Sequence, residues 1–158
     1  MENQIRRASK KDIPKILHLL TQVCNVHHEG RPDIFRQDSQ KYNAQELALL
    51  MEDDSRPIFV YVDKEDNVLG YGFCVIIEYS GNNVILDRRE LYIDDLCVDE
   101  EARGRGVGGA IFEYLKTYAK EIGCYHVTLN VWACNPSAMA FYESKGMTML
   151  KKEMEVIL

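Results

Sequence analysis

Four glycines and two arginines gather in the seven residues from Arg103 to Gly109. Glycine lets the backbone approach a ligand closely, because no Cβ stands in the way. If a helix begins at the end of this loop, its unpaired N–H groups and the positive end of its dipole face outward. These features predict an anion site, and a pyrophosphate is the natural ligand for it. A plain turn into a helix would not need so many glycines.

The anion loop is expected to join a strand to a long helix. Aliphatic and β-branched residues in 91–98 are typical of a buried strand. After the loop, apolar residues recur at helical spacing and predict an amphipathic helix. They are Val107, Ala110, Ile111, Tyr114, Leu115, Tyr118 and Ile122.

Two other phosphate-binding motifs fit the loop less well. Gly104, Gly106 and Gly109 match G-x-G-x-x-G, but that dinucleotide pattern alone is a weak signal. A dinucleotide fold would need an acidic residue about 20 positions further on, and residues 126–131 supply none. A Walker loop is excluded because no Gly-Lys-Ser/Thr follows.

The remaining chain predicts a mixed α/β fold of about seven strands and about four helices. Strands are expected at 4–8, 57–63, 68–77 and 126–132, with 84–86 extending a hairpin and 148–150 and 153–158 forming a final one. Capping signals at Ser9, Asn43 and Asn135 mark the starts of three further helices. Residues 126–132 should lie parallel to 91–98 through a right-handed crossover. Gly70 and Gly72 indicate a bulge or close packing within their strand.

Length and composition favour one domain over residues 1–158, with 46% apolar and 28% charged residues. The first residues lack the apolar core of a secretory signal, and no apolar run is long enough for a membrane span. Five scattered cysteines favour the reducing cytoplasm. The net charge of −6 argues against nucleic acid as a partner and favours a cationic small substrate. His27 and His28 are adjacent, which is not the spacing of a metal site, so no metal is expected.

Arg103, Gly106 and Gly108 also fit Arg-x-x-Gly-x-Gly, placed after a strand and before a helix. On this motif the chain resembles the GCN5-related N-acetyltransferases (GNAT) over almost its whole length. The resemblance implies the GNAT acyl-CoA N-acyltransferase fold, with a mostly antiparallel central sheet. It also implies acetyl-CoA as the cofactor, with its pyrophosphate held by the loop residues Arg103, Gly104, Arg105, Gly106, Val107, Gly108 and Gly109. The pantetheine arm would pair with the backbone of Leu96, Cys97 and Val98 and contact Asn135.

The reaction implied by the resemblance is acetyl transfer from a thioester to an amine. An alkyl ammonium is only about 0.04% neutral at pH 7, so a group must hold the cation and receive its proton. Asp94 lies where the family often has an acidic residue that acts as a base through water, and Asp95 is the substrate-binding candidate. Neighbouring strand residues face opposite sides, so we expect at most one of them to face the acceptor. The alternative is that both cap turns or pair with Arg88 or Arg89.

Tyr142 occupies the position of the family's general acid, and the alternative is a core aromatic residue beside Phe141. Phe35 lies in a loop that often shapes the acceptor pocket in the family, although a solvated connector is equally compatible with it. Cys97 could suggest a covalent acyl-enzyme, but no histidine is near it in the sequence to activate it. Direct sequential transfer is therefore the favoured mechanism.

The sequence thus predicts an acetyl-CoA-dependent N-acetyltransferase that acts on the primary amine of a small acceptor, polyamine-like or otherwise cationic, and releases coenzyme A. A non-catalytic acetyl-CoA-binding sensor or interaction domain stays open as an alternative. So does acetylation of protein N-termini or lysines. Since dimers are frequent in the resembling family, a homodimer is a further expectation.

Overall fold

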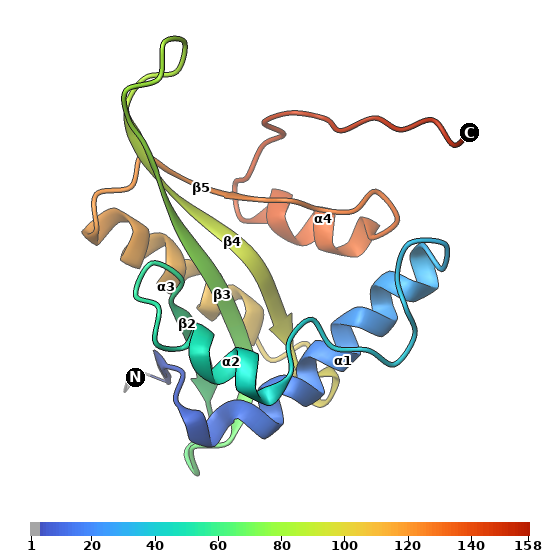
Figure 1. Ribbon diagram of the computed structural model, residues 1–158. Coiled ribbons are helices and arrows are strands. Elements are labelled where there is room, and N and C mark those ends of the chain that lie inside the picture. The colour runs from blue at the N-terminus through green and yellow to red at the C-terminus, as the bar shows by residue number, and fades with distance from the viewer. Residues whose placement is uncertain (1–3) are drawn as a thin grey trace.

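A five-stranded sheet lies between two layers of helices in the computed structural model, which describes residues 4–158 (Figure 1). The strands are β1 (Ile5–Arg7), β2 (Ile58–Val62), β3 (Val68–Tyr79), β4 (Arg88–Val98) and β5 (His126–Leu129). The helices are α1 (Ile13–Gly30), α2 (Ala44–Leu50), α3 (Val107–Glu121) and α4 (Pro136–Ser144). The sheet order is β1-β2-β3-β4-β5, antiparallel except for the parallel pair β4–β5. The predicted mixed α/β fold with this parallel pair is confirmed.

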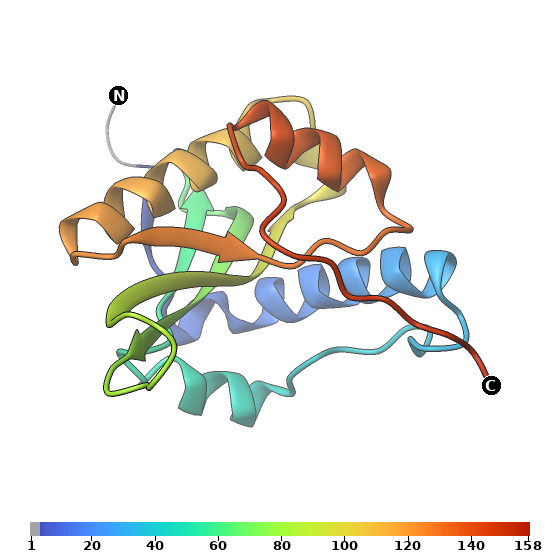
Figure 2. The ribbon, with the colours of Figure 1, turned by 90° about the horizontal axis from the view of Figure 1, so that it is seen from above.

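Each face of the sheet carries its own hydrophobic core. The view from above shows helices on both faces of the sheet (Figure 2). On one face, α1 and α2 contribute Ile16, Leu19 and Leu47, all fully buried. On the other face, α3 contributes Ile111 and Leu115, and α4 packs beside it. The apolar stripes read from the sequence therefore face the sheet, which fixes the rotation of each helix about its axis.

The helices begin where local side-chain chemistry predicted. Asn43 and Glu46 form a capping box, in which the Asn43 side chain accepts a hydrogen bond from the Glu46 amide at 2.8 Å. Asn135 caps α4 in the same way by accepting from the Ala138 amide at 3.2 Å, with Pro136 in the first turn. Each cap satisfies a backbone donor that the helix itself leaves unpaired.

Gly70 and Gly72 are sites of close packing between β3 and its neighbours. A Cβ at Gly70 would lie 2.8 Å from the backbone oxygen of Cys97, and one at Gly72 would lie 2.9 Å from a methyl group of Leu115. The β3–β4 register shifts between Phe73 and Cys74, and the β2–β3 register shifts next to Gly70, between the pairs Tyr61↔Gly70 and Val62↔Val68. Gly70 therefore lies beside an irregularity and is also closely packed, whereas Gly72 is a site of close packing.

Two of the seven predicted strands are absent, and so is the predicted extension of the hairpin at residues 84–86. Residues 84–86 form no strand, because the Asn82 side chain accepts hydrogen bonds from the amides of Val84 and Ile85 and holds them in a turn. Residues 148–150 and 153–158 form no hairpin, since neither segment pairs with a strand of the described chain. The predicted strand 126–132 is also shorter and ends at Leu129.

Among the described helices, none has the combination of length and apolar content needed to cross a membrane.

Replacing Gly70 with alanine is expected to lower the free energy of unfolding by about 1–3 kcal/mol, because the added methyl group meets backbone that cannot rotate away. Denaturant titration would measure this. Leu49→Ala, which truncates a side chain 64% exposed on α2, is the control and should change stability by less than about 0.5 kcal/mol. A Gly70→Ala protein as stable as the parent would contradict the packing argument.

Candidate active site

The second half of β4 has a free edge in the centre of the sheet. β5 pairs with β4 only from Glu90↔His126 to Ile93↔Leu129. Beyond this point, residues 95–98 still pair with β3 but have no strand on the other side within the described chain. This free edge includes Leu96, Cys97 and Val98, the backbone predicted to pair with the pantetheine arm. An extended ligand could add to the sheet here through main-chain hydrogen bonds.

A β-bulge lies at the start of this free edge. The β3–β4 register moves from Phe73↔Asp95 to Cys74↔Ile93, so that Asp94 is the extra residue on β4. The bulge interrupts the alternation of side chains, and both Asp94 and Asp95 lie close enough to Lys41 to raise its pKa. The expectation that at most one of the two would face the acceptor side assumed regular alternation, and the bulge removes its basis.

The Asp94 carboxylate forms an ion pair with a lysine of the same chain. Lys41, from the segment between α1 and α2, donates a hydrogen bond to Asp94 Oδ2 at 2.6 Å. Burial lowers the pKa of Lys41, but the ion pair with Asp94 outweighs it and holds the pKa above its usual value. The Asp94 side chain is only 17% exposed. Asp94 is thus placed to bind a cationic amine.

Asp95 occupies a less polar position beside β3. The Tyr71 hydroxyl, from a fully buried side chain, donates a hydrogen bond to Asp95 Oδ2 at 2.7 Å. Burial raises the pKa of Asp95 to about 6, against smaller opposing effects of the Tyr71 hydrogen bond and the Lys41 charge. A carboxylate with this pKa is a stronger proton acceptor than an ordinary aspartate. Neither aspartate pairs with Arg88 or Arg89, which bond instead to His126 and Glu78.

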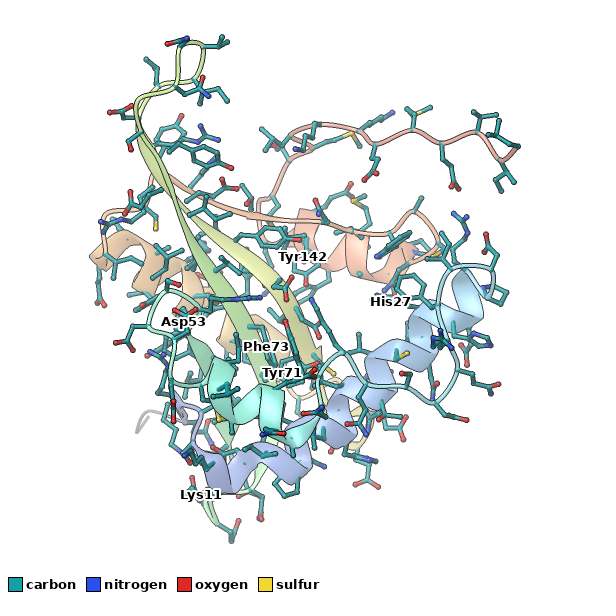
Figure 3. All side chains as sticks on the ribbon, viewed as in Figure 1. Lys11, His27, Asp53, Tyr71, Phe73 and Tyr142 are labelled. Atoms are coloured by element: carbon teal, nitrogen blue, oxygen red, sulfur yellow. The ribbon has the colours of Figure 1, made fainter. Side chains whose placement is uncertain are left out.

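Tyr142 lies on α4 and is seen above Tyr71 and Phe73 in Figure 3. Burial raises its pKa to about 12, with further contributions from Asp95 and Cys97, so these groups lie near one another. No hydrogen bond of its hydroxyl to another described residue is present. Since no fully buried side-chain oxygen or nitrogen of the described residues lacks a partner, this hydroxyl must reach accessible space. Tyr142 packs against Phe141 and Phe112, as the alternative interpretation expected, yet its polar end stays available.

The anion loop opens directly onto the N-terminus of α3. Gly104 and Gly106 have φ values of +76° and +80°, a region that residues with a Cβ rarely adopt. The first helical hydrogen bond runs from the Ala110 amide to the Gly106 oxygen at 3.0 Å. The amides of residues 107–109 are therefore free of helical partners and can bind an anion.

Gly108 and Gly109 bring other elements close to this helix start. A Cβ at Gly108 would lie 3.3 Å from Val98 and 3.5 Å from the Phe141 ring. A Cβ at Gly109 would lie 3.0 Å from the Lys145 ammonium, which adds a positive charge next to the free amides. Sequence reasoning missed Lys145, because only the packing of α4 on α3 brings it to the loop.

Two surface cavities lie on the other side of the loop. Arg105 lines both, and their volumes are about 570 and 290 Å³. The larger one is also lined by Lys11 and Lys15, but these ammonium groups are paired with the carboxylates of Asp66 and Asp99. The larger cavity is therefore a poorer candidate for the pyrophosphate than the free amides at the α3 N-terminus.

An aromatic cluster lies near the C-terminal end of α1. Phe35 lies between His27 of α1 and Trp132, with ring centroids 4.8 and 4.9 Å away. Burial, together with the nearby Lys41, lowers the pKa of His27, so this imidazole is neutral at pH 7. The structure thus brings the predicted residue Phe35 together with His27 and Trp132, and it places Lys41 near His27. Nothing in the spacing of His27, Trp132 and Lys41 along the chain could have found these three.

Two predicted cofactor contacts have structural roles of their own. The Asn135 side-chain oxygen is engaged in capping α4, which leaves its amide nitrogen available to a ligand. Burial raises the pKa of Cys97 to about 12, so this residue is a neutral thiol at pH 7 and a poor nucleophile.

Comparison with known proteins identifies the class. The sequence model of the acetyltransferase (GNAT) family matches residues 16–147. A mutant of the BH1408 protein from Bacillus halodurans has the same fold, with a TM-score of 0.93, 33% identity and 98% of each chain covered. This chain belongs to the acetyltransferase (GNAT) family, as the resemblance predicted.

Among curated relatives, the chain is similar to the probable glucosamine 6-phosphate N-acetyltransferase 2 of Oryza sativa subsp. japonica. The two are 42% identical over 55 residues, which are 35% of this chain and 31% of that protein. The chain is 32% identical over 79 residues to the thialysine N-epsilon-acetyltransferase of Bos taurus, covering 50% of this chain and 44% of the relative. The matches thus span about a third to a half of the relatives' lengths.

Replacing Gly106 with valine is expected to abolish binding of coenzyme A, because valine cannot keep φ at +80° and the free amides lose their orientation. Titration calorimetry with coenzyme A would measure the affinity. Gly81→Val is the matched control, since Gly81 also has a positive φ and open space around it but lies in the β3–β4 turn. Unchanged affinity in Gly106→Val would remove the loop from the anion site.

Proposed function

We propose that this protein transfers an acetyl group from acetyl-CoA to the primary amine of a small cationic acceptor. One observation carries the proposal: the anion loop, Tyr142 and the two aspartates surround the same free edge of β4. A pyrophosphate at the α3 N-terminus and an extended pantetheine arm along residues 96–98 would bring the thioester between Tyr142 and Asp95. A cytoplasmic location, with its reducing conditions, would suit the five free cysteines.

Binding of the acceptor is supported by the Lys41–Asp94 ion pair. In this pair the Asp94 carboxylate accepts a hydrogen bond from a primary ammonium group. A substrate amine would replace Lys41 there, and the aromatic cluster of His27, Phe35 and Trp132 would contact its apolar part. The glucosamine 6-phosphate and thialysine named for two relatives are amines, so both belong in any substrate panel.

Proton transfer must precede attack by the amine. Removing a proton from an alkyl ammonium at pH 7 costs about 4.6 kcal/mol. Asp95, with its pKa raised to about 6, is a better acceptor than a fully solvated carboxylate, directly or through a water molecule. Asp94 then positions the cation, although the family position favours Asp94 as the base. Replacing each residue separately distinguishes these roles.

The chemical step forms a bond between the amine nitrogen and the carbonyl carbon and breaks the carbon–sulfur bond. The electron pair leaves with the sulfur of coenzyme A, and the second proton of the nitrogen balances the one that this sulfur takes up, so that coenzyme A is released as a thiol. Tyr142, with a pKa raised to about 12, is fully protonated at pH 7 and can donate a hydrogen bond to the leaving sulfur. The neutral Cys97 thiol favours direct transfer over an acyl-enzyme.

A non-catalytic acetyl-CoA sensor is the second candidate, and acetylation of protein N-termini or lysines is a third. A sensor needs neither a proton donor at the thioester nor an ammonium site. Thiol release from acetyl-CoA, followed across a panel of polyamines, amino sugar phosphates, lysine analogues and peptides, separates the three. Binding of acetyl-CoA without acceptor-dependent thiol release would favour the sensor, and release with peptides alone would favour the third candidate.

Tyr142→Phe is expected to lower kcat by about ten-fold or more, because the leaving sulfur loses its hydrogen-bond donor. The KM for acetyl-CoA should hardly change, since the aromatic ring is retained. Steady-state kinetics would measure both. Tyr114→Phe, which removes a hydroxyl from the side of α3 that packs on Phe59, is the matched control and should keep full activity. Equal turnover in the two variants would exclude Tyr142 from the mechanism.

The pH profile of kcat/KM is expected to fall as the pH drops below about 6, because protonated Asp95 can no longer accept a proton. Asp95→Asn should lower activity at neutral pH and remove this limb. Asp94→Asn should keep the limb and raise the KM of the amine. His27 also has a lowered pKa and lies near Lys41, so the His27→Gln variant tests whether His27 is the base instead of Asp95. Loss of the limb in His27→Gln, with retention in Asp95→Asn, would assign the base to His27.

A further inference from the structure

One lysine of the chain contacts the carboxylates at the free edge of β4. The Lys41 ammonium lies 2.6 Å from Asp94 Oδ2, and its charge also acts on the neighbouring Asp95. In the other lysine ion pairs of residues 4–158 the carboxylates lie outside β4, at Glu52, Asp66, Asp99 and Glu113. Lys41 therefore places an amine of the protein itself at the proposed acceptor site.

The backbone is held by side-chain hydrogen bonds on both sides of Lys41. Toward α1, the Asn25 side chain donates to the Asp38 carboxylate at 3.0 Å and accepts from the Asp38 amide at 2.8 Å. Toward α2, the capping box of Asn43 begins the helix two residues after Lys41. The connection between these two points returns along α1 (Figures 1 and 2). The place from which the Lys41 side chain reaches Asp94 is thus defined by the fold.

The ion pair leaves the amine able to react. The Lys41 side chain is 48% exposed, and an ion pair of a half-exposed lysine adds little to stability, so the pair can open without disturbing the fold. Asp95 can then accept a proton from this ammonium, as proposed for an acceptor amine. Besides burial, the charge of Asp95 raises the pKa of Tyr142. The proposed proton acceptor and the proposed donor to sulfur therefore lie in the same region as this amine.

We propose that Lys41 is a site of self-acetylation, in which its Nζ accepts the acetyl group of acetyl-CoA bound to the same chain. This inference rests on the proposed acetyl transfer and extends it to an amine of the protein. Asp95 takes one proton from the ammonium, the nitrogen forms a bond with the carbonyl carbon, and the carbon–sulfur bond breaks. The electron pair leaves with the sulfur, which takes up a proton as the nitrogen loses its second one. The products are coenzyme A as a thiol and a neutral amide on Lys41, which no longer pairs with Asp94.

Spontaneous acetylation by the thioester would not favour Lys41. That reaction needs the neutral amine, and although burial lowers the pKa of Lys41, the ion pair with Asp94 outweighs it and holds the pKa above its usual value. Lys116 is a matched comparison, because its side chain is 45% exposed and pairs with Glu113 on α3. Selective modification of Lys41 over Lys116 would therefore indicate catalysis by the site.

The test follows the mass of the full chain during incubation with acetyl-CoA and no acceptor amine. Intact-mass spectrometry should show the gain of one acetyl group, and peptide mapping should place it on Lys41. The fraction modified at a given time should not depend on protein concentration, because the amine and the thioester belong to one complex. A rate that rises with protein concentration would mean transfer between copies and would overturn the proposal. Equal modification of Lys41 and Lys116 would overturn it as well.

The dependence on acetyl-CoA separates a bound thioester from one in solution. The rate of Lys41 acetylation should level off as acetyl-CoA is raised and should fall when coenzyme A is added as a competitor. A rate that stays proportional to acetyl-CoA and is insensitive to coenzyme A would overturn the proposal.

Lys41→Arg keeps a positive charge beside Asp94 but removes the amine, so this variant should gain no acetyl group. Lys116→Arg is the matched control and should be modified like the wild type. An acetyl group gained equally by Lys41→Arg and the wild type would contradict the assignment to Lys41.

Thiol release with the amine panel is a separate readout. Acceptor-dependent release by a protein whose Lys41 stays unmodified would overturn this inference and leave the proposed function intact. Modification of Lys41 without release across the panel would support the inference and mean that the panel lacked the acceptor. Absence of both would overturn the two together.

Discussion

The separation of β5 from β4 after the Ile93–Leu129 pair is the constraint on which the candidate site depends. Up to this pair the two strands share parallel hydrogen bonds, and beyond it the bulge at Asp94 turns the β4 backbone. The backbone of residues 96–98 then has no strand on one side within the described chain, and this is where we propose that the extended pantetheine arm pairs. A continuous β4–β5 ladder would close this edge.

The two aspartates at this edge differ in their surroundings and therefore in their properties. Asp94 has an ammonium beside it, whereas Asp95 lies against the buried Tyr71 hydroxyl and has a raised pKa. One carboxylate therefore suits binding of a cation and the other suits acceptance of a proton. Tyr142 has its pKa raised by the same enclosed surroundings, which keeps its proton on the oxygen and suits it to donate a hydrogen bond to the leaving sulfur. The proposed acid and base thus owe their properties to one poorly solvated region.

The anion loop lies where α3, β4 and α4 meet. Its free amides depend on positive φ values at Gly104 and Gly106, while Gly108 lets α3 approach Val98 and the Phe141 ring. One short glycine-rich stretch therefore leaves amides free for the proposed anion site and also sets the distance between α3, β4 and α4. This double role explains why several glycines are needed where a turn alone would need fewer.

The sequence by itself determined the helices, the order of the main strands, the anion loop and the family. Capping side chains, apolar periodicity and glycines act over a few residues, so their effect can be read locally. Only the tertiary structure decided that Lys41 meets Asp94, that Tyr71 meets Asp95, and that His27 and Trp132 enclose Phe35. It also replaced the predicted C-terminal hairpin with an unpaired segment. Strand pairing and side-chain contacts depend on residues far apart in the chain, and no local pattern specifies which partner comes close.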